Sequence, residues 1–299
     1  MNKNIKNFVR DTLRFLFGKD LYNKVRFVIT HKYYPDLITP RSFSEKIFAR
    51  KYNSKSKGFS SYVDKYTVRK YVSETIGEQY LVPLIKKTEY VTPEFFSDTP
   101  EQFVIKTSNG GGGENVVIVK NKSTLGDLVK LSKKFNTYLN EKIGSKIDEQ
   151  FYDIEKPTLL MEALLVHKNG ALPSDYKLHI FNDDVNTIVF IQVDTDRFTN
   201  HKRSIFTEDL MKANFGIQPK YQPVTDDYSF PSNMDELVYL GKKLAAPFKY
   251  VRVDMYNLDG NIYFGEMTFC HGSGWEPFSC KEADFLLGGY WHEYDSNHC

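Results

Sequence analysis

Residues 102–119 read QFVIKTSNGGGGENVVIV. Residues 102–107 and 115–119 are rich in β-branched side chains, so they predict two short strands joined by a tip of four glycines. Glycine can reach positive φ and approach a ligand closely, so its amides can converge on phosphate oxygens, and Lys106 adds a positive charge at the strand end. A strand follows the glycines, which distinguishes the stretch from phosphate loops that open a helix. A nucleoside triphosphate would fit beneath such a flap, but taken alone the stretch favours a mobile hairpin tip with a solvated lysine.

A second predicted hairpin carries two carboxylates near the end of the chain. Two apolar strand patterns flank Leu258-Asp259-Gly260, a strong turn signal. The turn places Asp254 and Glu266 across from each other, where two bare carboxylates repel unless a cation lies between them. Paired oxygen ligands of this kind suit Mg²⁺. Arg252, on the same strand face as Asp254, could balance their charge instead, so a salt bridge among the three is the alternative.

The pattern from Ser61 onward is that of a mixed α/β protein. We find no internal repeat, low-complexity tract or long linker. Apolar periodicity predicts helices at about residues 63–75, 123–140 and 235–246. The extended segments predicted beside the glycine hairpin are residues 79–85, 158–166, 178–181, 187–193, 250–257 and 261–269.

Composition excludes several classes of protein. The chain has 299 residues, 41% of them hydrophobic, which suits one or two globular domains and excludes a disordered chain or a disulfide miniprotein. Its three cysteines lack CxxC spacing, so neither a disulfide framework nor a zinc knuckle is predicted. The apolar stretches fall short of the roughly 20 residues that span a bilayer, and no signal-peptide core begins the chain. We therefore expect a cytoplasmic protein.

Charge is distributed unevenly along the chain. Residues 1–58 hold 14 Lys/Arg and 4 Asp/Glu, whereas residues 59–299 hold 26 and 34. Apolar side chains recur at helical spacing within residues 1–26, with basic side chains between them, so this segment predicts a basic amphipathic helix. A solvated helix packed on the body is one interpretation, and peripheral contact with an anionic membrane, at its inner face, is the other. Nucleic acid is not an expected partner, because the segment has no recognition motif and the body is acidic.

The order of these motifs resembles the ATP-grasp superfamily and, more closely, its TupA-like branch, named for teichuronopeptide synthesis. The resemblance covers about residues 40–291. It implies an α+β ATP-grasp fold in which two α/β lobes clasp ATP. We expect a basic helical region at residues 1–60, an N-terminal lobe at 61–160 and a C-terminal lobe at 161–299. The segments that carry the resemblance are Pro40–Ile47, Asp64–Arg69, Lys106 with its glycines, Met161–Leu165, Asp175–Lys177, and the hairpin from Val251–Asp254 to Phe264–Thr268.

The resemblance implies a role for each matched residue. Thr268 stands where the commoner superfamily ending, Glu-x-Asn, has its asparagine, which puts a second metal site in doubt. The residues expected to bind ATP are Lys65, Lys106, Gly110, Gly111, Gly112, Gly113, Glu162, Leu164, Asp175 and Lys177. The residues expected to hold Mg²⁺ are Asp254, Glu266 and Thr268. Arg197 and Asn200 are expected to face the acyl substrate, with His271 and Ser273 in a substrate loop or a structural turn, and Arg203 and Arg252 to steady the tetrahedral adduct.

The chemistry that the resemblance implies is carboxylate activation. ATP would phosphorylate a substrate carboxylate to an acyl phosphate, and an amine would displace phosphate to leave an amide. For this branch the context suggests cell-surface polysaccharide or capsule synthesis, in which an amino acid is joined to a uronic acid or another glycan-linked carboxylate. Two alternatives remain: an ATP-dependent sugar or glycan phosphotransferase, and a noncatalytic module that binds a saccharide or a membrane surface.

Overall fold

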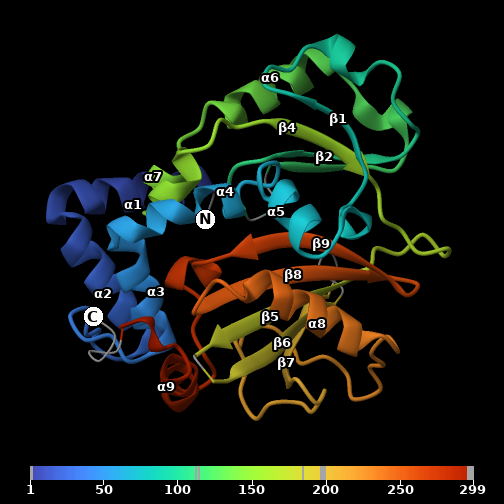
Figure 1. Ribbon diagram of the computed structural model, residues 1–299. Helices are drawn as coiled ribbons and strands as arrows, with labels where there is room; N and C mark the ends of the chain where they lie inside the picture. The colour runs from blue at the N-terminus through green and yellow to red at the C-terminus, as the bar shows by residue number, and fades with distance from the viewer. Residues whose placement is uncertain (1–2, 112, 114, 184, 196–199, 295–299) are drawn as a thin grey trace.

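The computed structural model describes residues 3–111, 113, 115–183, 185–195 and 200–294 (Figure 1). Its strands form two antiparallel sheets, which lie one above the other in Figure 1 with α4 (Ser60–Val63) and α5 (Val68–Thr75) between them. The small sheet has the order β1-β4-β2-β3, from Leu84–Thr88, Leu159–Ala163, Phe103–Thr107 and Val116–Val119. The large sheet has the order β7-β6-β5-β8-β9, from Lys202–Thr207, Thr187–Thr195, Ser174–Asn182, Tyr250–Leu258 and Asn261–Thr268.

One face of the small sheet is covered by α6 (Leu128–Leu139). Phe103 and Ile105 of β2 and Phe135 of α6 are fully buried in one apolar cluster. Successive strand residues point to opposite faces, so Lys106 projects from the face that α6 does not cover. The sheet therefore presents Lys106 on its charged side, towards the other sheet.

The large sheet separates an apolar face from a charged one in the same way. Leu178 and Ile180 lie beside Gly241 of α8 (Met234–Ala245), so this helix covers the apolar face. The alternating positions carry Lys177 on β5 and Asp254 on β8, which are directly paired in the sheet. The charged face thus lies opposite α8.

The N-terminal helices α1 (Lys3–Phe17), α2 (Lys19–His31) and α3 (Phe43–Tyr52) lie at one end of the molecule (Figure 1). Ser42 and Glu45 form a capping box that begins α3. Arg50 of α3 donates to the carbonyls of Tyr250 and Phe269 at 2.9 and 3.0 Å. The motif around Ser42 therefore fixes the helix that joins the N-terminal region to the large sheet. The remaining helices are α7 (Ile143–Ile147) and α9 (Lys281–Gly289).

Most predicted elements are present, but two predicted helices are wrong at their ends. The helix predicted at 63–75 is interrupted because Asp64 accepts hydrogen bonds from the backbone amides of Tyr66 and Thr67. The helix predicted at 123–140 begins only at Leu128, where Asp127 caps it. The extended segment predicted at 79–85 includes a 3-10 turn, and its strand begins only at Leu84. Among the described residues, no helix is both long and apolar enough to cross a membrane.

Substitutions at two neighbouring glycines of α9 test its close packing on α3. A Cβ at Gly288 would lie 2.1 Å from the Arg41 carbonyl oxygen and 2.6 Å from the Phe43 nitrogen, whereas a Cβ at Gly289 meets nothing within 4 Å. We expect Gly288→Ala to lower the free energy of unfolding by about 2 kcal/mol, because backbone atoms must shift. Gly289→Ala should leave it unchanged or raise it, because alanine favours a helix. Urea melts that are the same for both variants would contradict this packing.

Candidate functional site

The first group of site residues lies on the charged side of the small sheet. Glu162 of β4 is buried and sits between two cations, 2.6 Å from Nζ of Lys106 and 3.2 Å from Nη1 of Arg69. These partners offset the cost of burying its charge. Leu164 follows directly after β4 and is half-buried. Lys106 and Glu162, which the sequence predicted in separate roles at the nucleotide site, are thus in direct contact, and Arg69 joins them.

Lys65 joins the glycine loop to the carboxylate hairpin. Its backbone nitrogen donates to the Ser108 carbonyl at 3.0 Å, and its ammonium group donates to the Gly110 carbonyl. The same ammonium nitrogen lies 3.9 Å from Oε2 of Glu266 on β9. Burial and the neighbouring positive charge of Lys106 lower the pKa of Lys65, although Glu266 opposes this shift. A buried lysine with a second lysine close to it is well suited to bind an anion.

The glycine loop begins in a conformation that requires glycine. Gly110 has a φ of +72° and lies against Ile143, so a side chain there would be strained and crowded. Asn115 donates to the Asn109 carbonyl at 2.8 Å and so ties the base of the loop together. Gly111 is exposed, and its added Cβ would meet nothing within 4 Å. Gly112 lies outside the described residues, and Gly113 has a φ of +80°.

The carboxylate hairpin has the register that the turn predicts. Asp254 and Glu266 are paired across β8 and β9, which confirms their placement as neighbours. They are not bare, because Arg252 lies between them: its Nε and Nη2 are 2.6 and 2.8 Å from the two oxygens of Asp254, and Nη2 is 2.9 Å from Oε1 of Glu266. Thr268 also contacts Arg252 Nη2, at 3.0 Å. Lys177 binds Asp254 as well, at 2.7 Å. The salt bridge considered as an alternative is therefore present.

Asp254 and Glu266 differ in how available they are to bind a metal cation. Burial alone would raise the pKa of Asp254, but the charges of Arg252 and Lys177 outweigh it and hold the pKa well below its usual value. The Asp254 side chain is 3% exposed and both its carboxylate oxygens accept hydrogen bonds, whereas the Glu266 side chain is 32% exposed. Glu266 thus offers the accessible oxygen, of the type that Mg²⁺ prefers. Within the described ranges, no group of three or more acidic, histidine or cysteine side chains is arranged to hold a metal ion.

A chain of polar contacts continues from Arg252 to Arg203. Nη1 of Arg252 lies 2.8 Å from Nδ1 of His271, and arginine only donates, so Nδ1 accepts and Nε2 carries the proton. Burial lowers the pKa of His271, so its ring is neutral at pH 7. Its Nε2 lies 3.2 Å from Oε2 of Glu276, which also accepts from Nη1 of Arg203 at 2.7 Å. The two predicted catalytic arginines are therefore linked through His271 and the Glu276 carboxylate.

Sequence reasoning missed Glu276 and Asp194. Asp194 accepts from Nε of Arg203 at 2.7 Å and from Nε2 of Gln192 at 2.7 Å. A buried charge in an apolar strand was a usable signal for Asp194. The sequence held no such signal for Glu276, because this residue lies in a loop 73 residues beyond Arg203.

The remaining predicted site residues do not form one group. Ser273 has a φ of +55° and is tied to two buried groups, accepting from Lys51 at 2.9 Å and donating to Glu149 at 2.5 Å. Burial raises the pKa of Glu149 to about 7. Asp175 bonds to Lys177 and so joins the charged face of the large sheet. Asn200 is exposed just before β7, and Arg197 lies outside the described residues.

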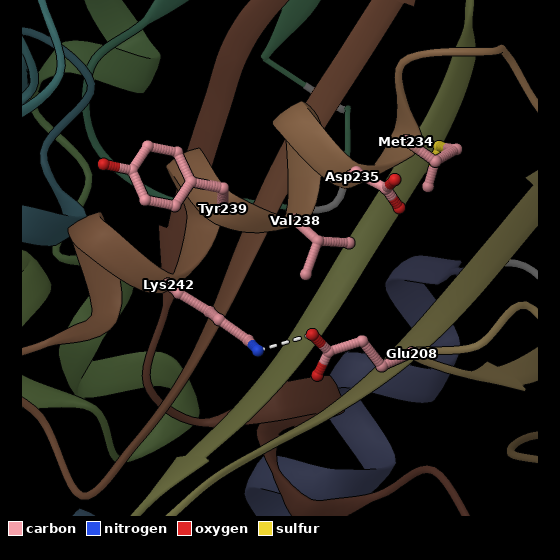
Figure 2. Close-up of a pocket in the computed structure, with 6 residues that line it drawn as sticks. All are labelled: Glu208, Met234, Asp235, Val238, Tyr239 and Lys242. Carbon is pink, nitrogen blue, oxygen red and sulfur yellow. Dashed lines mark hydrogen bonds and ion pairs between the residues drawn. The ribbon is translucent and has the colours of Figure 1, made fainter.

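The surface also has a hollow that lies away from the charged residues described above. It has a volume of about 270 Å³ and lies beside α8, on the opposite side of the large sheet from the charged face. Figure 2 shows Lys242 and Glu208 pointing towards each other across it. This ion pair leaves the hollow without convergent polar groups, so the charged face is the better candidate. The other lining residues are Met234, Asp235, Val238 and Tyr239.

Two antiparallel sheets, with a glycine hairpin and a lysine on one and a carboxylate hairpin on the other, define an ATP-grasp protein, which is the predicted α+β fold. The family model described as TupA-like ATPgrasp matches residues 45–292. The chain belongs to this family, so the resemblance seen in the sequence is confirmed.

Solved structures match this chain at low identity. An ADP complex of N5-carboxyaminoimidazole ribonucleotide synthetase is 14% identical, with a TM-score of 0.43, 71% of this chain covered and 46% of that chain. D-alanine-D-alanine ligase from Helicobacter pylori is 14% identical, with a TM-score of 0.41 and coverages of 77% and 60%. Phosphoribosylamine–glycine ligase from Thermotoga maritima is 15% identical, with a TM-score of 0.39 and coverages of 70% and 48%. This chain thus spans about half the length of these proteins. No match was found among curated protein sequences.

Neutralising each carboxylate of the hairpin should have a different effect on stability. Asp254→Asn removes the charge that balances buried Arg252 and Lys177, so we expect the free energy of unfolding to fall by about 3 kcal/mol. Glu266→Gln changes a partly exposed partner and should cost less than about 1 kcal/mol. Chemical denaturation of both variants without nucleotide measures the difference. A larger loss for Glu266→Gln would mean that Arg252 depends mainly on Glu266.

Proposed function

We propose that the protein is an ATP-dependent carboxylate–amine ligase that works with Mg²⁺ and forms an amide. The observation that carries the proposal is the position of Lys65, which donates to the Gly110 carbonyl, lies 3.9 Å from the accessible carboxylate of Glu266 and is close enough to Lys106 to feel its charge. A buried lysine beside an accessible carboxylate, with a second lysine close by, suits an anion that brings a divalent cation with it. Membership of the TupA-like ATP-grasp family supports the same assignment.

The nucleotide site would use both sheets. Lys65 and Lys106 would bind the phosphates, and Gly110–Gly113 would close over them. Glu162 orients Lys106, and the backbone at Leu164 would meet the adenine edge. Asp175 and Lys177 would line the ribose and phosphate region. Glu266 would be the principal ligand of Mg²⁺, with Asp254 and Thr268 beside it, and the metal would neutralise phosphate charge.

The substrate side would use the two linked arginines. ATP would supply the phosphoryl group that converts the substrate carboxylate to an acyl phosphate, from which an amine displaces phosphate to give the amide. Arg252 and Arg203 would stabilise the developing oxyanion, and the neutral His271 keeps Arg252 in place. Arg197, Asn200 and the loop carrying Ser273 would contact the acid or the amine.

For the substrates themselves, we propose a uronic acid or another glycan-linked carboxylate and an amino acid, in cytoplasmic steps of cell-surface polysaccharide synthesis. Membership of the TupA-like family is the support for this choice.

Removing Lys106 should weaken nucleotide binding. We expect Lys106→Ala to raise the Kd for Mg·ATP at least about tenfold, because a charge-assisted contact with phosphate is lost. Lys130→Ala is the matched control, since its ammonium is exposed on α6. Calorimetric titration measures both, and thermal melts check that each variant folds. Wild-type affinity in a folded Lys106→Ala protein would remove this lysine from the proposed site.

Product analysis separates the ligase from its alternatives. The purified protein, incubated with ATP, uronic acid-containing saccharides and amino acids, should release phosphate only when acid and amine are both present. The product should gain the mass of acid plus amine minus water. A phosphorylated sugar formed without amine would instead identify a phosphotransferase. Nucleotide binding without turnover across the substrate panel would favour a noncatalytic module.

A further inference from the structure

Several large apolar side chains of α1 face solvent, and one of its basic side chains faces the protein. The Arg14 side chain is 10% exposed and lies 2.6 Å from Oδ1 of Asp148. On the other side of the helix, Phe8, Phe15 and Leu16 are 72%, 87% and 65% exposed. A solvated helix packed on a protein body has the opposite arrangement, with its apolar stripe facing inward. Packing on the body therefore does not explain why these apolar side chains of α1 face outward.

The next helix, α2, repeats this pattern while being firmly held. Its inward face buries Phe27 and His31, and the Phe27 ring packs 5.2 Å from that of Phe48 on α3. Its outward face carries an apolar stripe at i, i+4, i+7 and i+8, which is one side of a helix. The stripe consists of Leu21, Val25, Val28 and Ile29, which are 53%, 51%, 36% and 64% exposed.

Each of these two neighbouring helices exposes several large apolar side chains on its outward side, and gathered exposed apolar side chains mark an interaction surface. We propose that the outward faces of α1 and α2 bind the surface of an anionic lipid bilayer. This surface lies at one end of the molecule (Figure 1), so the enzyme body would remain in water.

Charge favours a bilayer over other occupants. Residues 3–32 hold eight Lys/Arg and two Asp/Glu. Arg14 and Arg26 face the protein, whereas Lys19 and Lys32 are exposed. A second copy of the chain would bring two such positive surfaces together, which is unfavourable. Anionic headgroups complement the charge, while aromatic and aliphatic side chains enter the headgroup boundary, as in interfacial amphipathic helices.

The inward side of α2 connects this surface to the loop after β9. Nε2 of His31 lies 2.9 Å from the Gly274 carbonyl oxygen, and the Arg26 guanidinium lies 3.7 Å from the centre of the Trp275 ring. A bilayer bound to α2 would therefore lie one helix away from the loop that carries His271. The binding proposal itself does not depend on ligase activity.

The test is cosedimentation of the full chain with vesicles of equimolar phosphatidylcholine and phosphatidylglycerol at low salt, beside vesicles of phosphatidylcholine alone. We expect binding to the anionic vesicles and its loss at high salt. Phe15→Ser with Ile29→Ser should weaken binding at least about tenfold, because both side chains would enter the lipid boundary. Val185→Ser with Met211→Ser is the matched control, since it removes two apolar side chains of similar exposure elsewhere, and it should bind like the wild type.

Three outcomes would overturn the proposal: a wild-type protein that ignores anionic vesicles, equal binding to both kinds of vesicle, or equal binding by both variants. A concentration-dependent dimer that the Phe15 and Ile29 substitutions abolish, without vesicle binding, would assign the surface to a second copy instead. Thermal melts verify that both variants fold. Sedimentation needs neither ATP nor substrate, so a negative result would leave the proposed ligase activity standing.

Discussion

The site is organised around one buried cation, the guanidinium of Arg252. Removing its charge from water is costly, and the cost is offset only because every side of the group finds an acceptor. Asp254 accepts hydrogen bonds from Nε and Nη2, His271 accepts one from Nη1, and Glu266 accepts a second one from Nη2. These partners come from two strands and the loop after them. The geometry of the candidate site therefore follows from satisfying a single arginine.

The sequence allowed the two hairpins to be predicted because their signals are local. The turn at Leu258-Asp259-Gly260 determines which residues face each other across β8 and β9, so the pairing of Asp254 with Glu266 could be worked out in advance. The cationic side chains that bond to these two carboxylates could not be predicted in the same way. Lys177 reaches Asp254 from a strand 77 residues earlier, and such contacts leave no periodic trace in a sequence. The same reason explains why Glu276 was not predicted.

Periodicity likewise identifies an amphipathic helix without stating which face meets the protein. For the N-terminal segment the spacing of apolar residues fits a packed helix and a surface-bound helix equally well. The difference comes from one tertiary partner, Asp148, which draws Arg14 inward and turns Phe15 outward. A helix was thus predictable in this region, and its orientation was not.

The packing of α3 against the end of the chain has a consequence for biosynthesis. Lys46 donates to the Gly288 carbonyl, a separation of 242 residues, and Arg50 reaches Glu293. The apolar side of α3, with Phe43 and Ile47, cannot be covered until those residues have left the ribosome. At typical elongation rates this delay is on the order of tens of seconds. During that interval the nascent chain exposes the hydrophobic surface of α3, which makes it a natural client for chaperones.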